Sequence, residues 1–88
     1  MNYEVNHRPE RRRFELEKDG MTAFVEYELE DGMLDITHTI VPRPLEGQGV
    51  ASALVETAYA YATGQGLEPK ATCSYAVAWL KRHPAGTK

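Results

Sequence analysis

The sequence contains one cysteine, Cys73, among its 88 residues. A single thiol cannot form an internal disulfide, and a metal site built from several cysteines is excluded. Histidine, aspartate and glutamate are nowhere grouped at metal-ligand spacing, so we expect no metal ion. No apolar run is long enough to cross a bilayer, and the N-terminus has no signal-peptide pattern. We therefore expect a cytoplasmic protein that does not bind membranes.

A strong excess of one charge is also lacking, since 10 Lys and Arg face 13 Asp and Glu. Arg8 and residues 11–13 form the one basic cluster, and no aromatic residues are interleaved with it. A solvated face explains this cluster better than nucleic-acid binding, so we expect no nucleic-acid partner. The acidic residues of the predicted strands are also expected to face solvent: Glu15, Glu17, Glu26, Glu28, Glu30 and Asp35.

The length of 88 residues allows one domain with one modest hydrophobic core. We predict a single domain over residues 1–88, with irregular segments at 1–10 and 85–88. Because so small a core gives limited stability, a bound ligand or a second subunit stabilises such a chain noticeably. We expect a monomer or a homodimer.

Apolar and polar residues alternate, as in half-buried strands, over residues 13–18, 22–30 and 33–41. The dipeptides Asp19-Gly20 and Asp31-Gly32 separate these segments, and Asp-Gly is a strong signal for a tight hairpin. The first half of the chain therefore predicts an antiparallel meander of three strands.

The apolar residues then recur at steps of three and four over residues 47–63, which predicts an amphipathic helix. Residues 67–72 indicate a fourth strand, weakened by Pro69, and residues 75–82 a second helix, capped by Ser74. The predicted order is β-β-β-α-β-α. We expect an α+β fold in which helices cover a mostly antiparallel sheet, with a right-handed crossover that leaves the third and fourth strands parallel.

The longest predicted helix begins on two glycines, in the segment Gly47-Gln48-Gly49-Val50-Ala51-Ser52. A helix N-terminus presents unpaired N–H groups and a positive dipole end, and glycines let a phosphate approach them. The alternative is a plain strand-to-helix turn. The segment is not a P-loop, because Val50-Ala51 stands where a Lys-Ser/Thr pair belongs, and the chain is too short for a Rossmann fold.

Two prolines, Pro42 and Pro44, stand just before this segment. Proline donates no ladder hydrogen bond, so we expect the third and fourth strands to stop pairing near Val41. The backbone groups around Ile40 and Val41 then need water or an amide-bearing ligand. A strand end that pairs with amides, followed by a loop for pyrophosphate, suits coenzyme A (CoA), which carries amides in its pantetheine arm.

Three segments, THTIVP, LEGQGVASALV and GLEPKATCSYAVAWLKRHP, together with the small size, resemble the GNAT N-acetyltransferase superfamily and most closely its minimal YjdJ-like members. The resemblance covers residues 13–84. It implies the central GNAT fold, acetyl-CoA as the ligand and transfer of its acetyl group to an amine. It also implies CoA contacts at Val41 and residues 47–52. Pro44 departs from the superfamily, which usually carries Gln or Arg at that position.

Two residues are candidates for the chemistry of acetyl transfer. Cys73 ends the predicted fourth strand directly before Ser74, where a helix N-terminus lowers the pKa of a thiol. The resemblance implies a place near the CoA sulfur, as nucleophile or proton donor; the alternative is a small buried residue. His38 shares the predicted apolar strand face with Ile36 and Ile40, and is either a general base or a core histidine.

Tyr75 and Trp79 lie four residues apart on the second predicted helix and either pack on the core or cover pantetheine. Arg82, in the last turn, is a secondary candidate for a CoA phosphate contact. Three hypotheses follow. The first is a minimal acetyl-CoA-dependent N-acetyltransferase acting on an unidentified amine of a small molecule or protein. The second is a non-catalytic CoA or acyl-CoA binding module with a regulatory or partner role. The third is a structural domain that binds no CoA.

Overall fold

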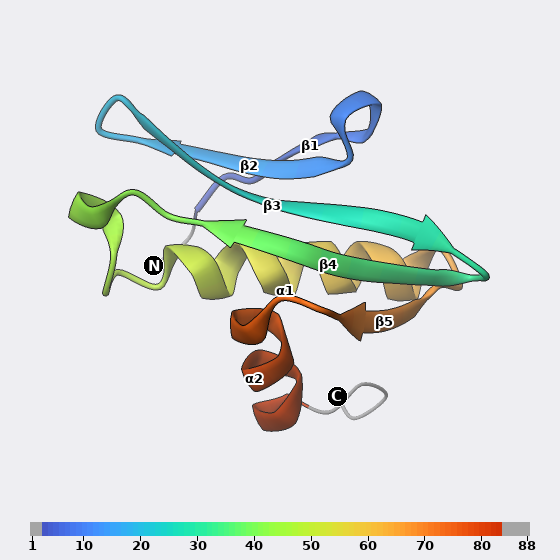
Figure 1. Ribbon diagram of the computed structural model, residues 1–88. Helices are drawn as coiled ribbons and strands as arrows, with labels where there is room; N and C mark the ends of the chain where they lie inside the picture. Colours follow the sequence, from blue (N-terminus) through green and yellow to red (C-terminus); the bar gives the residue numbers. More distant parts are fainter. Residues whose placement is uncertain (1–2, 84–88) are drawn as a thin grey trace.

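The computed structural model describes residues 3–83, which form five strands and two α-helices (Figure 1). The elements are β1 (Asn6–Arg8), β2 (Arg13–Lys18), β3 (Met21–Glu30), β4 (Met33–Ile40), α1 (Val50–Gly64), β5 (Glu68–Ala71) and α2 (Ser74–Arg82). Short 3-10 turns follow β1 and β4, at Pro9–Arg11 and Arg43–Leu45. No helix within this range is long and apolar enough to span a membrane.

The strands form one sheet in the order β1-β2-β3-β4-β5. Neighbouring strands are antiparallel from β1 to β4, whereas β5 runs parallel to β4. α1 connects these two parallel strands and lies against one face of the sheet, and α2 follows β5 beside α1 (Figure 1). The predicted α+β fold, with a mostly antiparallel sheet and one parallel crossover, is confirmed.

Both predicted Asp-Gly hairpins are present. Asp19 and Gly20 have φ angles of 54° and 76°, and Asp31 and Gly32 have φ angles of 52° and 75°. Positive φ at both central positions is typical of the type I′ turn, whose twist matches that of the flanking strands. β2, β3 and β4 therefore form a continuous meander, as the sequence predicts.

The hydrophobic core lies between α1 and the sheet, where alternating strand residues meet the apolar stripe of the helix. The strands contribute Phe14, Leu16, Ala23, Val25, Leu34 and Ile36, and α1 contributes Leu54, Val55, Ala58 and Ala62. Leu45, in the loop before α1, is also completely buried. This side chain anchors the loop, and hence the start of α1, to the core.

The prediction of an irregular segment over residues 1–10 is wrong for Asn6–Arg8, which pairs with β2 as β1. The ring of His7 holds this strand in place. It stacks on Phe14 with 4.1 Å between centroids, meets the edge of Tyr61, and places Nε2 2.6 Å from the Tyr27 hydroxyl. A strand of three residues is too short to show a period. The predicted irregular tail, residues 85–88, lies outside the described range.

A bulge in β4 reverses the faces of the strand. Tyr27 pairs with Ile36, but Glu26 pairs with His38, so Thr37 is one extra residue in β4. Because side chains alternate between faces, the insertion moves every later residue of β4 to the other face. The predicted common face of His38 and Ile36 is therefore wrong. The His38 side chain is 66% exposed, on the face opposite α1.

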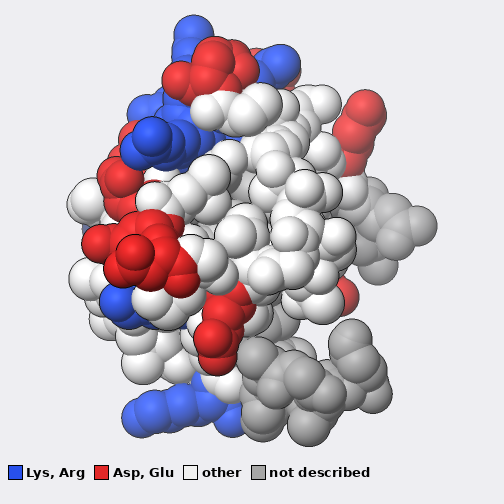
Figure 2. Space-filling model, turned by 90° about the vertical axis from the view of Figure 1, so that its right-hand side faces the viewer, with Lys and Arg blue, Asp and Glu red and all other residues white. Residues whose placement is uncertain are grey.

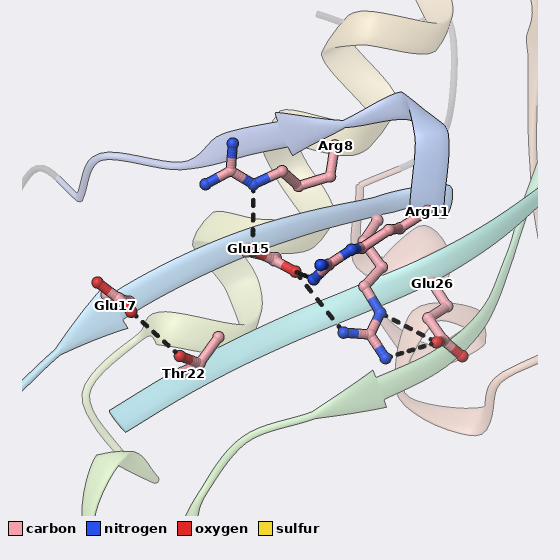
Figure 3. Close-up of polar contacts among 7 residues, drawn as sticks. Arg8, Arg11, Glu15, Glu17, Thr22 and Glu26 are labelled. Carbon is pink, nitrogen blue, oxygen red and sulfur yellow. Dashed lines mark hydrogen bonds and ion pairs between the residues drawn. The ribbon is translucent and has the colours of Figure 1, made fainter. Parts of the chain in front are cut away.

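The sheet face opposite α1 carries a network of ion pairs. Arg8 and Arg11 contact Glu15 (Figure 3). Arg13 contacts Glu15 at 3.6 Å and Glu26 at 3.0 Å. Figure 2, which views the molecule from the right-hand side of Figure 1, likewise shows basic residues beside acidic ones over its upper part. The basic cluster is thus compensated by neighbouring carboxylates, as expected for a solvated charged face.

Asp35 departs from the predicted row of solvent-facing acids, because its exposed fraction is only 8%. Its two carboxylate oxygens accept hydrogen bonds from the Thr72 hydroxyl at 2.8 and 3.1 Å. A buried carboxylate needs such a partner. Thr72 is 37 positions away in the sequence, so strand alternation alone gives no sign of the contact.

The burial of His7 predicts a pH dependence of stability. Burial lowers the pKa of His7 below its ordinary 6.5, against a smaller opposing effect of the Glu10 charge. The unfolded chain therefore binds more protons between the two pKa values. The stabilisation is complete above pH 6.5 and is lost as the pH falls through the lower pKa of the folded state.

We expect the melting temperature of the wild type to fall more steeply from pH 7.5 to 5 than that of His7→Gln. Parallel curves for the wild type and His7→Gln would contradict the prediction.

Candidate functional site

A pocket of about 630 Å³ opens where β4 ends, between the start of α1 and the exposed side of α2. Its lining residues are Thr39, Ile40, Val41, Leu45, Glu46, Gly47, Gly49, Val50, Ala51, Ser52, Tyr75 and Arg82. All the residues that the sequence predicts to bind a ligand are among them, except Gln48. The structure therefore brings together three segments that are separated in the sequence.

The pocket exists because β5 ends before β4 does. Their parallel pairing stops at Ile36 and Ala71, and the N–H groups of Thr72 and Cys73 both donate to the Ile36 carbonyl. Within residues 3–83, the rest of β4 has no strand partner on this edge. Every second residue there turns its N–H and C=O toward the open edge. The two strands do separate, but the predicted place and cause are wrong: pairing ends at Ile36 instead of near Val41, and it ends because the chain turns into α2 and not because of the prolines.

α1 begins without the usual cap. Gly49, at its N-cap position, and Gly47 both have φ angles of 79°, a left-handed conformation that favours glycine. No side chain caps the helix, and its first turn holds no acidic residue. Within the described range, no backbone carbonyl accepts a hydrogen bond from the N–H groups of residues 47–52. Free donors at the positive end of a helix dipole form a site for an anion.

Ser52 joins the first turn of α1 to α2. The indole N–H of Trp79 donates to Ser52 Oγ at 3.1 Å, and the Trp79 ring packs against Tyr59 with 5.8 Å between centroids. The Ser52 hydroxyl thus accepts one hydrogen bond and keeps its own O–H as a donor next to the pocket. Trp79 belongs to the hydrophobic core, which was one of the two predicted alternatives for this residue. Its contacts hold α2 in place as a wall of the pocket.

Cys73 lies at the N-cap of α2, where the β4 edge becomes open. The half-buried neutral thiol donates to the hydroxyl of Thr39, a pocket residue, at 3.4 Å and caps no helix N–H. Burial raises the pKa of Cys73, but hydrogen bonds from Thr39 and from the N–H groups of Ala76 and Tyr75 to the thiolate outweigh it and lower the pKa overall. Such a thiol can give up its proton or act as a nucleophile.

The sequence model of a family described as GCN5-related N-acetyl-transferase matches residues 13–88. The chain belongs to this family. The match spans every element that lines the pocket, and it confirms the resemblance to the GNAT superfamily. Membership indicates an acyl-CoA-dependent acetyltransferase.

Gln48 braces the loop of this GNAT protein instead of lining the pocket. Its side-chain Nε2 donates to the Pro44 carbonyl at 2.9 Å, and its backbone carbonyl accepts from the Tyr3 hydroxyl at 2.6 Å. Pro44, where the superfamily usually has Gln or Arg, therefore takes part through its carbonyl. If Gln48 contacts a ligand, it does so through its backbone N–H.

His38 is not brought together with Cys73. After the bulge its ring lies on the outer sheet face, with Nδ1 3.5 Å from Glu26 Oε1. It lines a second pocket of about 410 Å³ with Arg11 and Arg12. Two acidic residues of that pocket are paired with arginines, Glu28 with Arg12 and Glu26 with Arg13, each at 3.0 Å. The alternative of a core histidine is therefore wrong, and the general-base role stays a prediction for a residue that lies outside the first pocket.

Three pocket residues, Thr39, Leu45 and Glu46, are not identified from the sequence. Thr39 faces the pocket only because the bulge reverses β4, and alternation without a bulge assigns it to the other face. Leu45 had a usable signal, since a lone apolar residue in a Pro- and Gly-rich loop indicates an anchor. Glu46 has no such signal. Arg82, which the sequence indicated only as a secondary candidate, lines the pocket, and so does Tyr75.

The lowered pKa of Cys73 predicts a reactive thiol. Alkylation of Cys73 by iodoacetamide should follow a pH profile with a midpoint below that of N-acetylcysteine. Thr39→Val removes a hydrogen bond that favours the thiolate, so its profile should shift to higher pH. Because Cys73 is the only cysteine, the rate reports this thiol alone.

Thr37→Val is the matched control for this measurement. The Thr37 hydroxyl donates to the Glu26 carbonyl at 3.3 Å, away from the sulfur. Its profile should coincide with that of the wild type. A Thr39→Val profile that also coincides would show that Thr39 does not control the thiol.

Proposed function

We propose that this protein binds acetyl-CoA and transfers the acetyl group to the amine of an acceptor yet to be identified. One observation carries the proposal: in a GNAT-family chain, the open edge of β4 and the uncapped start of α1 belong to the same pocket. These features suit the two parts of CoA, because a strand edge pairs with amides and a helix N-terminus binds phosphate.

The pyrophosphate of CoA accepts hydrogen bonds from the N–H groups of residues 47–52 in this proposal. Charge-assisted bonds of this kind are about twice as strong as neutral ones. Gly49 itself is flanked by open space, since a Cβ atom built on it meets nothing within 4 Å. The O–H of Ser52, whose oxygen is held by Trp79, supplies one more donor.

The pantetheine arm lies along the open edge of β4, beside Ile40, Val41 and Tyr75. Its amides pair with backbone groups that have no strand partner in the described range. Tyr75 is 36% exposed and lines the pocket, so its ring is available to cover the arm. The thioester then reaches Thr39 and Cys73, which are joined by their hydrogen bond.

In the transfer step the neutral amine attacks the thioester carbonyl. A C–N bond forms, the C–S bond breaks, and CoA leaves as a thiolate. An N–H group of the β4 edge stabilises the oxyanion of the tetrahedral intermediate. The Cys73 thiol gives its proton to the departing sulfur, and the proton released by the amine restores the thiol through solvent. An acetyl-Cys73 intermediate is the alternative route, and it would add one acetyl group to the intact protein.

A non-catalytic CoA-binding module is the second candidate function. The composition of the pocket favours it, because its described lining contains one carboxylate, Glu46, and no histidine to serve as general base. Such a module binds CoA equally well but produces no acetylated amine.

Binding of CoA is tested first, by calorimetry with NAD as the control ligand. We expect saturable binding of CoA and at least about tenfold weaker binding to Gly49→Ala, because a side chain in the left-handed conformation strains the loop. Gly66→Ala is the matched control, since Gly66 has a φ angle of 76°, open space around its Cβ position and no place in the pocket lining. Both variants should lose about 1 kcal/mol of stability.

If Gly49→Ala binds CoA with unchanged affinity, the loop is not part of the CoA site. The absence of heat with millimolar CoA would overturn the proposed function altogether, and the loop would then be only a turn.

Turnover separates the enzyme from the binding module. Incubation with acetyl-CoA and a panel of small amines, polyamines and lysine peptides should release CoA with at least one acceptor, and Cys73→Ala should release it more slowly. Intact mass before acceptor is added reports any acetyl-Cys73. CoA binding without turnover for any acceptor would favour the module, and equal rates for Cys73→Ala would exclude Cys73 from the mechanism.

A further inference from the structure

Arg82 occupies a defined place in the pocket wall. It follows Tyr75 by two helical turns, and both residues line the pocket from the same side of α2. Trp79 lies between them and donates to Ser52 in the first turn of α1 at 3.1 Å. The helix that carries the Arg82 guanidinium is therefore held by a direct hydrogen bond to the start of α1, the proposed anion site.

Among the residues that the structure describes, no acidic group balances the charge of Arg82. Within residues 3–83, no carboxylate lies within ion-pair distance of Arg82, although Arg8, Arg11, Arg12 and Arg13 all have such partners. Glu46 is the one acidic residue of the lining, and it makes no ion pair with Arg82. A cation and the positive end of a helix thus face one pocket, which suits a ligand with more than one anionic group.

A cation in the last turn of a helix also complements the helix dipole, and this alone accounts for many such residues. Lys81 stands in the same turn of α2 and satisfies that role without lining the pocket. The difference between the two neighbours is their access to the pocket. Lys81 therefore serves as an internal control for any ligand contact of Arg82.

We infer that Arg82 binds the 3′-phosphate of CoA and makes the pocket selective for 3′-phosphorylated CoA over dephospho-CoA. The inference rests on the proposed CoA site. A phosphate monoester carries a charge of about −1.5 to −2 at pH 7. Arginine binds such a group through two parallel N–H donors, which lysine or glutamine cannot reproduce. Dephospho-CoA retains the pyrophosphate and pantetheine, so it differs from CoA only in the group assigned to Arg82.

The test compares the Kd values of CoA and dephospho-CoA for the wild type, Arg82→Gln and Lys81→Gln at low ionic strength. We expect Arg82→Gln to weaken CoA about fivefold and leave dephospho-CoA unchanged, so that the preference of the wild type is lost. Lys81→Gln should keep that preference. Added salt should reduce the preference of the wild type, because the contact is exposed.

The failure of this inference is distinguishable from failure of the proposed function. If the wild type binds CoA but Arg82→Gln keeps the wild-type preference, or weakens both ligands equally, the 3′-phosphate contact is excluded and the CoA site stands. If the wild type binds neither ligand, the proposed function fails and the inference fails with it. Unchanged melting temperatures of both variants ensure that the comparison reports binding.

Discussion

The candidate site depends on the different lengths of two paired strands. β4 continues for four residues after Ile36, its last residue paired with β5. The Ile36 carbonyl accepts from both Thr72 and Cys73, and this shared acceptor marks the point where the chain leaves the sheet. The open β4 edge, the position of Cys73 and the start of α2 all follow from that departure. A β5 that continued alongside β4 would fill the edge and remove the pocket.

The pocket walls are held by contacts of the core. The Tyr59 hydroxyl donates to the Lys70 carbonyl of β5 at 2.6 Å, while its ring packs against Trp79. Burial, with smaller effects of the nearby Asp35 and Cys73 charges, raises the pKa of Tyr59, so it remains a phenol and a donor. One side chain of α1 thus holds both β5 and α2. In a chain of 88 residues, the same packing that supports the fold also sets the width of the site.

The sequence predicted the fold well because the fold rests on local signals. Alternation, two Asp-Gly turns and a change of period were sufficient to place four of the strands and both helices. The features it missed are tertiary. The bulge at Thr37 adds one residue without changing the alternating pattern of residue types, so His38 was assigned to the wrong face. β1 is held by the ring of His7, and a three-residue strand carries no period of its own.

The conformation of the candidate binding loop was predictable for a related reason, since it depends on the backbone. Glycine at positions 47 and 49 permits the left-handed conformation that exposes the N–H groups, and both residues are visible in the sequence. The surroundings of the catalytic candidate Cys73 depend on side-chain geometry, which the sequence does not give. Thr39 enters the hydrogen bond to Cys73 only after the bulge has turned it toward the pocket.

The net charge of −3 is a poor guide to the ligands of this protein. Glu15, Glu26 and Glu28 of the outer sheet face are paired with arginines, whereas the pocket at the end of β4 is lined by one carboxylate, Glu46. The backbone N–H groups of residues 47–52 carry no net charge, so a count of charged residues does not include them. Because local fields decide binding at short range, an acidic protein can hold a polyanion where its backbone N–H groups converge. The composition excludes a general attraction to anions, but it does not exclude a localised anion site of this kind.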